Sequence, residues 1–136
     1  MKLKLKNRLL LAFVVFTILF LDQVSKFFAD NFFQVACNKG GAFGLGGNFG
    51  FISGLVLGIV FWLILQEKKA SNILGLSLIF GGGVSNFLDR VFIGCVRDFV
   101  DLKFFPNFNL ADSAITIGAF LIFFNLIFRR QDADES

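Results

Sequence analysis

Residues Ile73–Ile93 read ILGLSLIFGGGVSNFLDRVFI, and this stretch decides the fold class. It is close to the roughly 20 mainly apolar residues that an α-helix needs to cross the hydrocarbon core of a bilayer. Three further apolar stretches are of similar length, namely Leu9–Ala29, Phe49–Leu65 and Ala114–Phe128. The sequence therefore predicts an all-α integral membrane protein with four transmembrane helices.

The composition of the whole chain agrees with a membrane protein. Of its 136 residues, 56% are hydrophobic, 22 are Phe and one is Pro, a balance that no water-soluble surface of this size carries. The formal charge of +3 comes from basic residues scattered between apolar runs, which argues against a nucleic-acid partner. The length fits one domain. We assign residues 1–130 to a single membrane-embedded domain and residues 131–136 to a disordered cytoplasmic tail.

Basic residues are distributed unevenly over the predicted loops and ends. Eight of them precede the first span, separate the second from the third, or follow the fourth: Lys2, Lys4, Lys6, Arg8, Lys68, Lys69, Arg129 and Arg130. The two long connections, residues 30–48 and 94–113, carry only Lys39, Arg97 and Lys103. Because basic residues near span ends stay on the cytoplasmic side, we expect both termini inside and both long connections outside.

The first span also resembles a removable signal peptide, since a basic start precedes the apolar run Leu9–Leu21. No small-residue cleavage site follows that run directly, and Asp22, Gln23 and Lys26 extend the helix with polar side chains. We therefore interpret the first span as a retained helix.

The residue types that are missing exclude several chemistries. The chain has no His and no Tyr, which excludes Ser-His-Asp and Cys-His catalysis and His-ligated zinc. Two Cys are too few for a thiolate cage. We therefore expect no metal and no cofactor, and any chemistry must come from Asp, Asn, Arg, Lys, Ser or Thr.

Polar side chains gather at the outer ends of the predicted spans. They are Asp22, Lys26, Asn86, Asp89, Arg90 and Asp112. Each ionisable residue in such a span costs about 2.5–3.5 kcal/mol on insertion scales. Asp22 and Lys26 have the i,i+4 spacing of an ion pair, whereas Arg90 needs a partner on another element, either Asp22 or a substrate carbonyl. A functional site is favoured over a purely structural polar cluster, which stays open as the alternative.

The connection after the third span contains two carboxylates with different surroundings. Val96–Lys103 alternates like a strand, which places Asp98 on one face and Asp101 on the other. We interpret Asp101 as solvated. Asp112 has the position of an N-cap for the fourth helix, so the connection can fold back and bring Asp98 close to it. Two such carboxylates would share a proton, with Asp112 ionised by the helix dipole and Asp98 protonated.

Cys37 and Cys95 both fall on the predicted outer side. A disulfide between them would tie the two long connections together, because oxidation is possible in that compartment. Two independent apolar fillers are the simpler interpretation, and the sequence leaves both open.

Five motifs, taken together and in this order, resemble those of the lipoprotein signal peptidase (signal peptidase II) family, bacterial intramembrane aspartyl endopeptidases. They are Asp22-Gln23-x-x-Lys26, Asn38-x-Gly40-x-Ala42-Phe43, Gly82-Gly83-x-x-Asn86-x-x-Asp89-Arg90, Val96-x-Asp98-Phe99 and Phe108-Asn109-x-Ala111-Asp112-Ser113. The resemblance implies a four-helix bundle with a small extracytoplasmic β-sheet cradle. It also implies a multi-pass protein of the bacterial inner membrane with its site at the outer leaflet.

The same resemblance implies the chemistry and the residues that perform it. The substrate would be a prolipoprotein whose Cys carries diacylglyceryl, cut just before that Cys. Membrane lipids would be the other partners of a monomeric enzyme. Asp98 and Asp112 would be catalytic. The substrate-binding residues would be Asp22, Lys26, Asn38, Gly40, Asn86, Arg90, Asn109 and Ala111. Arg97 stands where the family usually has an apolar residue, and it is placed to stabilise the ionised form of Asp98.

Two other classes of protein would also bury charges among four helices. A small transporter needs polarity through the whole bilayer depth, and here the inner halves are almost purely apolar apart from Asn125. A non-catalytic assembly subunit would keep the polar cluster without chemistry. An assay for cleavage of a lipidated precursor distinguishes a peptidase from a transporter and from an assembly subunit.

Overall fold

A computed structural model of the chain describes the backbone of residues 3–40 and 49–134 and the side chains of residues 3–40 and 50–128. The elements in chain order are α1 (Leu5–Phe32), β1 (Ala36–Asn38), α2 (Phe49–Gln66), α3 (Ala70–Phe92), β2 (Val96–Asp98) and α4 (Leu110–Asp134). Each predicted span lies within one of these helices, apart from Ile93, which caps the end of α3. The motif residues Ala42 and Phe43 belong to residues 41–48, which lie outside the described part.

The four helices differ in their capacity to cross a membrane. Within the described ranges, three helical segments are long and apolar enough to do so: Leu5–Phe32, Ala70–Phe92 and Leu110–Phe128. The α2 segment Gly50–Gln66 is apolar but shorter. The structure therefore supports a mainly helical membrane protein with three candidate spans and a small sheet.

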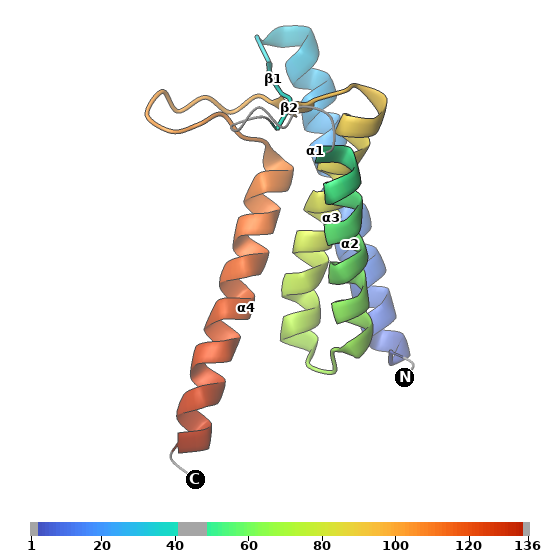
Figure 1. The fold of residues 1–136 in the computed structure, drawn as a ribbon, viewed down its shortest axis with the longest axis vertical. Coiled ribbons are helices and arrows are strands. Elements are labelled where there is room, and N and C mark those ends of the chain that lie inside the picture. Colours follow the sequence, from blue (N-terminus) through green and yellow to red (C-terminus); the bar gives the residue numbers. More distant parts are fainter. Residues whose placement is uncertain (1–2, 41–48, 135–136) are drawn as a thin grey trace.

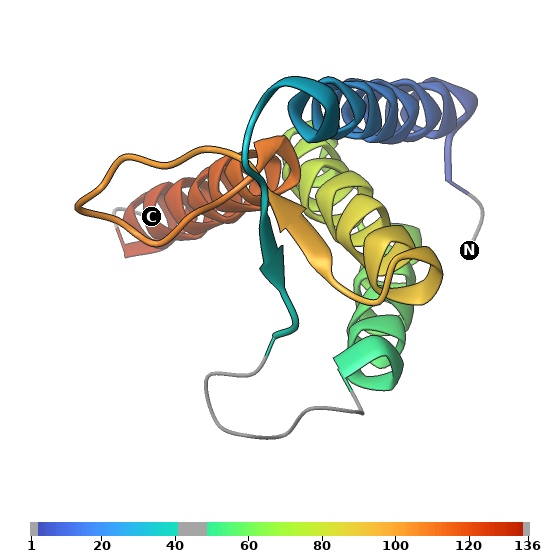
Figure 2. The same ribbon diagram turned by 90° about the horizontal axis from the view of Figure 1, so that it is seen from above.

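The central element is α3, which packs against α1, α2 and α4 (Figures 1 and 2). Both strands lie at one end of the bundle, here called the site end. The start of α1, the end of α4 and the α2–α3 connection lie at the other end (Figure 1). Large apolar side chains such as Phe13, Phe20 and Phe120 face outward, whereas Asp22, Lys26 and others are buried. This distribution is typical of helices surrounded by lipid.

Close packing of α3 on α4 depends on glycines. A Cβ on Gly75 would lie 2.9 Å from the carbonyl oxygen of Gly118, and one on Gly82 would overlap the carbonyl oxygen of Ala111. Small residues let two membrane helices approach closely in this way. The Gly54-x-x-x-Gly58 motif of α2 does not serve this purpose, because a Cβ on Gly58 would meet nothing within 4 Å.

The sheet has two antiparallel strands in which Ala36 faces Asp98 and Asn38 faces Val96. Cys37 and Cys95 form a disulfide, so the interpretation as two independent fillers is wrong. The predicted strand over Val96–Lys103 is correct only for its first three residues. Val100 pairs instead with Phe108, and Lys103 has a φ of 67°, a left-handed conformation that no strand continues through.

Candidate active site

The buried core of the site end is built around the predicted pair Asp22–Lys26. The Lys26 Nζ lies 2.6 Å from Asp22 Oδ2 and 3.1 Å from Asp89 Oδ2, and it donates to Asn86 Oδ1. Both side chains of the pair are fully buried, so these bonds offset the cost of removing their charges from water. The expected i,i+4 ion pair is confirmed.

Asp22 also holds the start of α4. Its Oδ1 accepts a hydrogen bond from the backbone N–H of Ala111 at 2.8 Å, and its Oδ2 accepts one from Ser85 Oγ at 2.6 Å. The first N–H groups of a helix have no partner within the helix, and an anion is favoured at that end. Asp22 and Ala111 are thus brought together, with the carboxylate fixing the first turn of α4 against α1 and α3.

Asp98 is held by two amides and is only 2% exposed. Asn38 Nδ2 donates to its Oδ2 at 3.0 Å, and Asn109 Nδ2 donates to its Oδ1 at 2.9 Å. The amide of Asn38 is itself oriented, because its Oδ1 accepts the backbone N–H of Gly40 at 2.8 Å. Gly40 adopts a φ of 75°, which glycine does without strain.

Burial raises the pKa of the Asp98 carboxyl above its usual value, and the charge of Asp112 adds to this effect. The hydrogen bonds from Asn38 and Asn109 and the charge of Lys26 act in the opposite direction. A carboxyl in this environment holds a proton at higher pH than a solvated one. The expectation that Asp98 holds a proton more readily than a solvated carboxyl agrees with this shift.

Asp112 forms a reciprocal pair with Asn109 at the start of α4. The Asn109 side chain accepts the backbone N–H of Asp112 at 2.9 Å, and Asp112 Oδ2 accepts the backbone N–H of Asn109 at 3.1 Å. This is the geometry of a capping box, with Asn109 as the N-cap. The prediction that Asp112 is the N-cap is therefore wrong, since it lies in the first turn of the helix.

Two asparagines connect the carboxylates. Asn86 Nδ2 donates to Asp112 Oδ1 at 2.9 Å, and Asn86 Oδ1 accepts from Asn109 Nδ2 at 3.0 Å. Because Asn109 also donates to Asp98, one chain of amides joins Asp98 to Asp112. Beside Asp112 lies a cavity of about 300 Å³, lined also by Phe105, Phe108, Ser113, Thr116 and Ile117.

Arg90 differs from the other predicted site residues. Its Nε is buried without a hydrogen-bond partner in the described part of the chain. The residue lines a second cavity of about 430 Å³ together with Lys39 and Phe87. Of the two partners considered for Arg90, Asp22 is not the one found, because it is bonded to Lys26, Ser85 and Ala111.

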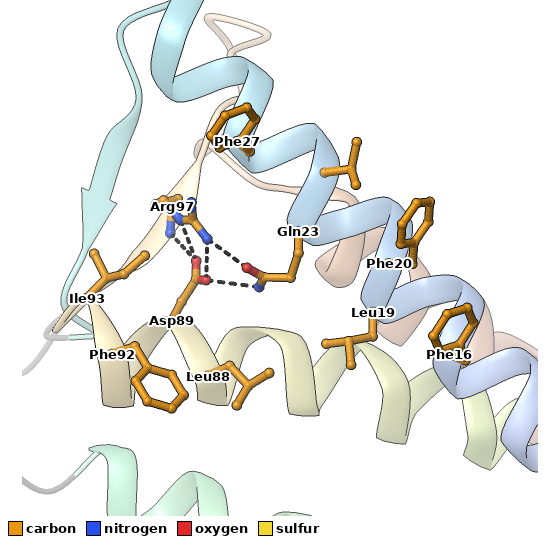
Figure 3. Close-up of a pocket in the computed structure, with 11 residues that line it drawn as sticks. Phe16, Leu19, Phe20, Gln23, Phe27, Leu88, Asp89, Phe92, Ile93 and Arg97 are labelled. Carbon is orange, nitrogen blue, oxygen red and sulfur yellow. Dashed lines mark hydrogen bonds and ion pairs between the residues drawn. The ribbon is translucent and has the colours of Figure 1, made fainter.

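The sequence reasoning missed a cluster formed by Gln23, Asp30, Asp89 and Arg97. The Arg97 guanidinium donates to both oxygens of Asp89 and to Gln23 Oε1 (Figure 3). It also donates to Asp30 Oδ2. These bonds, chiefly those to Asp89, raise the pKa of Arg97 above its usual value. Arg97 therefore faces away from Asp98, and the expectation that it stabilises ionised Asp98 is wrong.

A cavity of about 490 Å³ lies between α1 and α3 next to this cluster (Figure 3). Its lining is apolar except for Gln23, Asp89 and Arg97, with Phe16 and Phe92 among the aromatic members. It does not include either carboxylate of the Asp98–Asp112 pair, so the largest of the three cavities described here lies apart from that pair.

Fold and site define a helical membrane protein with two neighbouring carboxylates and no His. A family model described as Signal peptidase (SPase) II matches residues 14–128. The chain belongs to the signal peptidase II family, and the predicted resemblance is confirmed.

Proteins named lipoprotein signal peptidase are among its relatives. The one from Caldanaerobacter subterraneus subsp. tengcongensis is 37% identical, with 85% of this chain and 94% of the relative covered. That from Staphylococcus carnosus is 33% identical, with 85% and 89% covered. Two solved structures of bacterial membrane enzymes each match with a TM-score of 0.76. Their identities are 27% and 31%, and the matches cover 96% and 92% of this chain and 93% and 95% of those chains.

Proposed function

We propose that this enzyme removes the signal peptide of prolipoproteins, cutting just before a Cys that carries diacylglyceryl, with Asp98 and Asp112 as its catalytic pair. The observation that carries the proposal is the chain of amides from Asp98 through Asn109 and Asn86 to Asp112. It orients both carboxylates in a chain that lacks His, and a family of peptidases supplies the reaction class.

The two carboxylates have different surroundings, and we assign them different roles in acid–base hydrolysis. Asp112 lies in the first turn of α4 and lines a cavity; in this proposal it takes a proton from the attacking water. Asp98 is buried, and its pKa is raised; it donates a proton to the leaving nitrogen. Arg97 does not oppose this role, because its guanidinium is bonded to Asp89, Gln23 and Asp30.

The eight predicted substrate-binding residues divide into groups by their contacts. Asn38, Asn86 and Asn109 donate to the catalytic carboxylates, and Gly40 orients one of these amides. Asp22, Lys26 and the backbone of Ala111 fix the start of α4. Arg90 alone among the eight has a buried donor without a partner within the described chain, so it is the residue we assign to a substrate carbonyl.

The decisive assay is cleavage of a lipidated prolipoprotein by the purified enzyme in detergent, with the unlipidated precursor as substrate control. Asp98→Asn and Asp112→Asn should each lose cleavage by about three orders of magnitude or more, because an amide cannot exchange the required proton. The double variant should be little worse than either single one. The matched control is Asp101→Asn, whose carboxylate is exposed and bonded to Lys103. Near-normal cleavage by Asp98→Asn, or an equal loss in Asp101→Asn, contradicts the assignment.

We further propose that α2 is the fourth transmembrane span and that residues 1–130 form one domain of a monomeric inner-membrane protein, with residues 131–136 as a cytoplasmic tail. The site would then lie at the outer leaflet, where the acyl chains of the substrate remain among membrane lipids. The disulfide leaves no free thiol in the chain, so introduced cysteines can be labelled without background. Lys103→Cys should react with an impermeant reagent from outside and Lys68→Cys should not. Labelling at position 68 contradicts this topology.

A further inference from the structure

The guanidinium of Arg97 is fixed by three side chains from two helices. Its Nε and Nη2 contact the two oxygens of Asp89 on α3 at 3.3 and 2.9 Å. Its Nη2 also donates to Gln23 Oε1 and its Nη1 to Asp30 Oδ2, both at 2.8 Å and both on α1. Asp89 is 1% exposed and the Arg97 side chain 14%, so the forked contact with Asp89 lies largely out of water, where such pairs are most specific.

The backbone of Arg97 takes part in the same arrangement. Its N–H donates to Asp89 Oδ2 at 3.0 Å, and its carbonyl oxygen accepts from Asn109 Nδ2 at 3.3 Å. That amide also donates to Asp98. The backbone N–H of Arg97 therefore bonds to α3. Its backbone carbonyl bonds to the Asn109 amide, which also holds Asp98.

The position of Arg97 in β2 makes these contacts relevant to Asp98. Successive residues of a strand point to opposite sides, so Asp98 points toward Asn38 and Asn109 while Arg97 points toward α1 and α3. The strand itself has three residues, and within the described residues it pairs with β1 alone. A two-stranded ladder of that length is weak, so other contacts must fix where β2 lies.

We propose that Arg97 is a positioning residue for Asp98: bonded to Asp89, Gln23 and Asp30, it fixes β2 against α1 and α3 and so sets the place of the adjacent carboxylate. This inference rests on the proposed catalytic role of Asp98. Displacement of a catalytic group by about 1 Å can reduce a rate by about a hundredfold. Four of the five guanidinium N–H groups are used by these partners. In this proposal Arg97 therefore acts through the strand and not by contact with the substrate.

The test measures kcat and KM for a lipidated precursor in Arg97→Met and Arg97→Lys. Arg97→Met should lower kcat about tenfold or more while KM changes less than twofold, because the carboxylate is displaced and the binding surface stays intact. Arg97→Lys should recover part of kcat, since an ammonium can meet Asp89 but cannot form the fork that reaches Gln23 and Asp30. Lys103→Met is the matched control: it removes one cation from the same connection, at a site 87% exposed, and should leave both constants unchanged.

The outcomes separate this inference from the proposed function. Asp98→Asn is measured in the same assay, and normal cleavage by that variant refutes the catalytic role itself. If Asp98→Asn is inactive and Arg97→Met keeps the wild-type kcat, Arg97 is not a positioning residue. A rise in KM without a fall in kcat also overturns the inference, because it would make Arg97 a substrate contact. Should Arg97→Met fail to accumulate in membranes, Arg97→Lys decides: a several-fold lower kcat at constant KM supports the inference, and a wild-type kcat overturns it.

Discussion

The contact between α3 and α4 is built differently at its two ends. At the end away from the strands, Gly75 lies against Gly118 and one hydrogen bond of 2.8 Å joins Asn125 to Asn72. At the site end, Gly82 lies against Ala111 in a similar close approach. There, however, Asn86, Asn109 and Asp112 are joined by several hydrogen bonds, and the ion pair Asp22–Lys26 lies behind them.

This difference bears on the role of the polar network at the site end. Small residues and van der Waals packing are enough to join two membrane helices, and the end away from the strands shows that α3 and α4 associate with little else. Buried charges add a desolvation cost that is often not repaid in stability. The polar network of the site end is therefore explained better by the orientation of Asp98 and Asp112 than by helix association.

Apart from changes to the two carboxylates and to the asparagines bonded to them, the largest effect on cleavage should come from a methyl group added at the glycine contacts. Gly82→Ala places a Cβ against the carbonyl oxygen of Ala111 and 2.9 Å from Ile115, which forces the start of α4 to move. Overpacking of this kind costs about 1–3 kcal/mol. Because Ala111 is bonded to Asp22 and adjoins Asp112, cleavage should fall tenfold or more, measured with the lipidated precursor.

Substitutions at two other glycines serve as controls for Gly82→Ala. Gly75→Ala makes a comparable clash at the other end, with Gly118 and Ile122 at 2.9 Å, so it should lower the Tm similarly but reduce cleavage much less. Gly58→Ala meets nothing within 4 Å and should change neither. Equal losses of cleavage in Gly75→Ala and Gly82→Ala would show that the two ends are not functionally distinct.

The next effect concerns the disulfide, which occurs only at the site end. Cys37–Cys95 joins residues 58 positions apart, next to Asn38 and close to Asp98. Removing such a bond costs about 2–4 kcal/mol, so Cys37→Ser should lower the Tm of the purified protein and reduce cleavage several-fold. Cys95→Ser and the double variant should match it, since all three lose the same bond. An unchanged Tm after reduction of the wild type contradicts this prediction.

The sequence predicted the parts of this comparison that depend on periodicity and composition. Apolar runs located all four helices, because length and hydropathy are local properties. The i,i+4 rule predicted the pair Asp22–Lys26. Motif order selected Asn38, Asn86 and Asn109, which the fold brings together around Asp98 and Asp112.

The misassigned details depend on tertiary contacts. Asn109 and Asp112 are both good capping residues three positions apart, so the sequence alone does not decide which is the N-cap. Strand alternation places Arg97 on the other face of the strand from Asp98, but the partners of Arg97 on α1 and α3 are distant in sequence. The predicted strand ends at Asp98, after which Val100 pairs with Phe108 and Lys103 adopts a positive φ although it is not a glycine. No local feature of the sequence indicates either.

A smaller effect should appear in the pH dependence of stability. Asp98 faces Asp112 from α4 and Lys26 from α1, and burial raises its folded pKa above the usual value of about 4. The folded state then binds the proton more tightly than the unfolded state, so this group favours folding at acid pH, and the contribution is lost as the pH rises through the raised pKa. Residue 98 cannot titrate in Asp98→Asn. The Tm of this variant minus the Tm of the wild type should therefore become larger as the pH rises from roughly 4 to 8. A pH-independent difference would show that the raised pKa does not affect folding.

The smallest effect should come from the polar pair at the other end. Asn125→Leu removes the hydrogen bond to Asn72, whose own amide still donates to Glu67 at 3.0 Å. Interhelical hydrogen bonds in membranes contribute about 0.6 kcal/mol on average, so the Tm should fall by only a few degrees and cleavage should stay within twofold of wild type. Asn86→Leu is the matched change at the site end, where one side chain bonds to Lys26, Asn109 and Asp112. It should abolish cleavage, because the amide chain between the two carboxylates is cut. If Asn125→Leu impairs cleavage as strongly as Asn86→Leu, polar contacts at both ends serve the same purpose, and the assignment of catalysis to the site end loses its support.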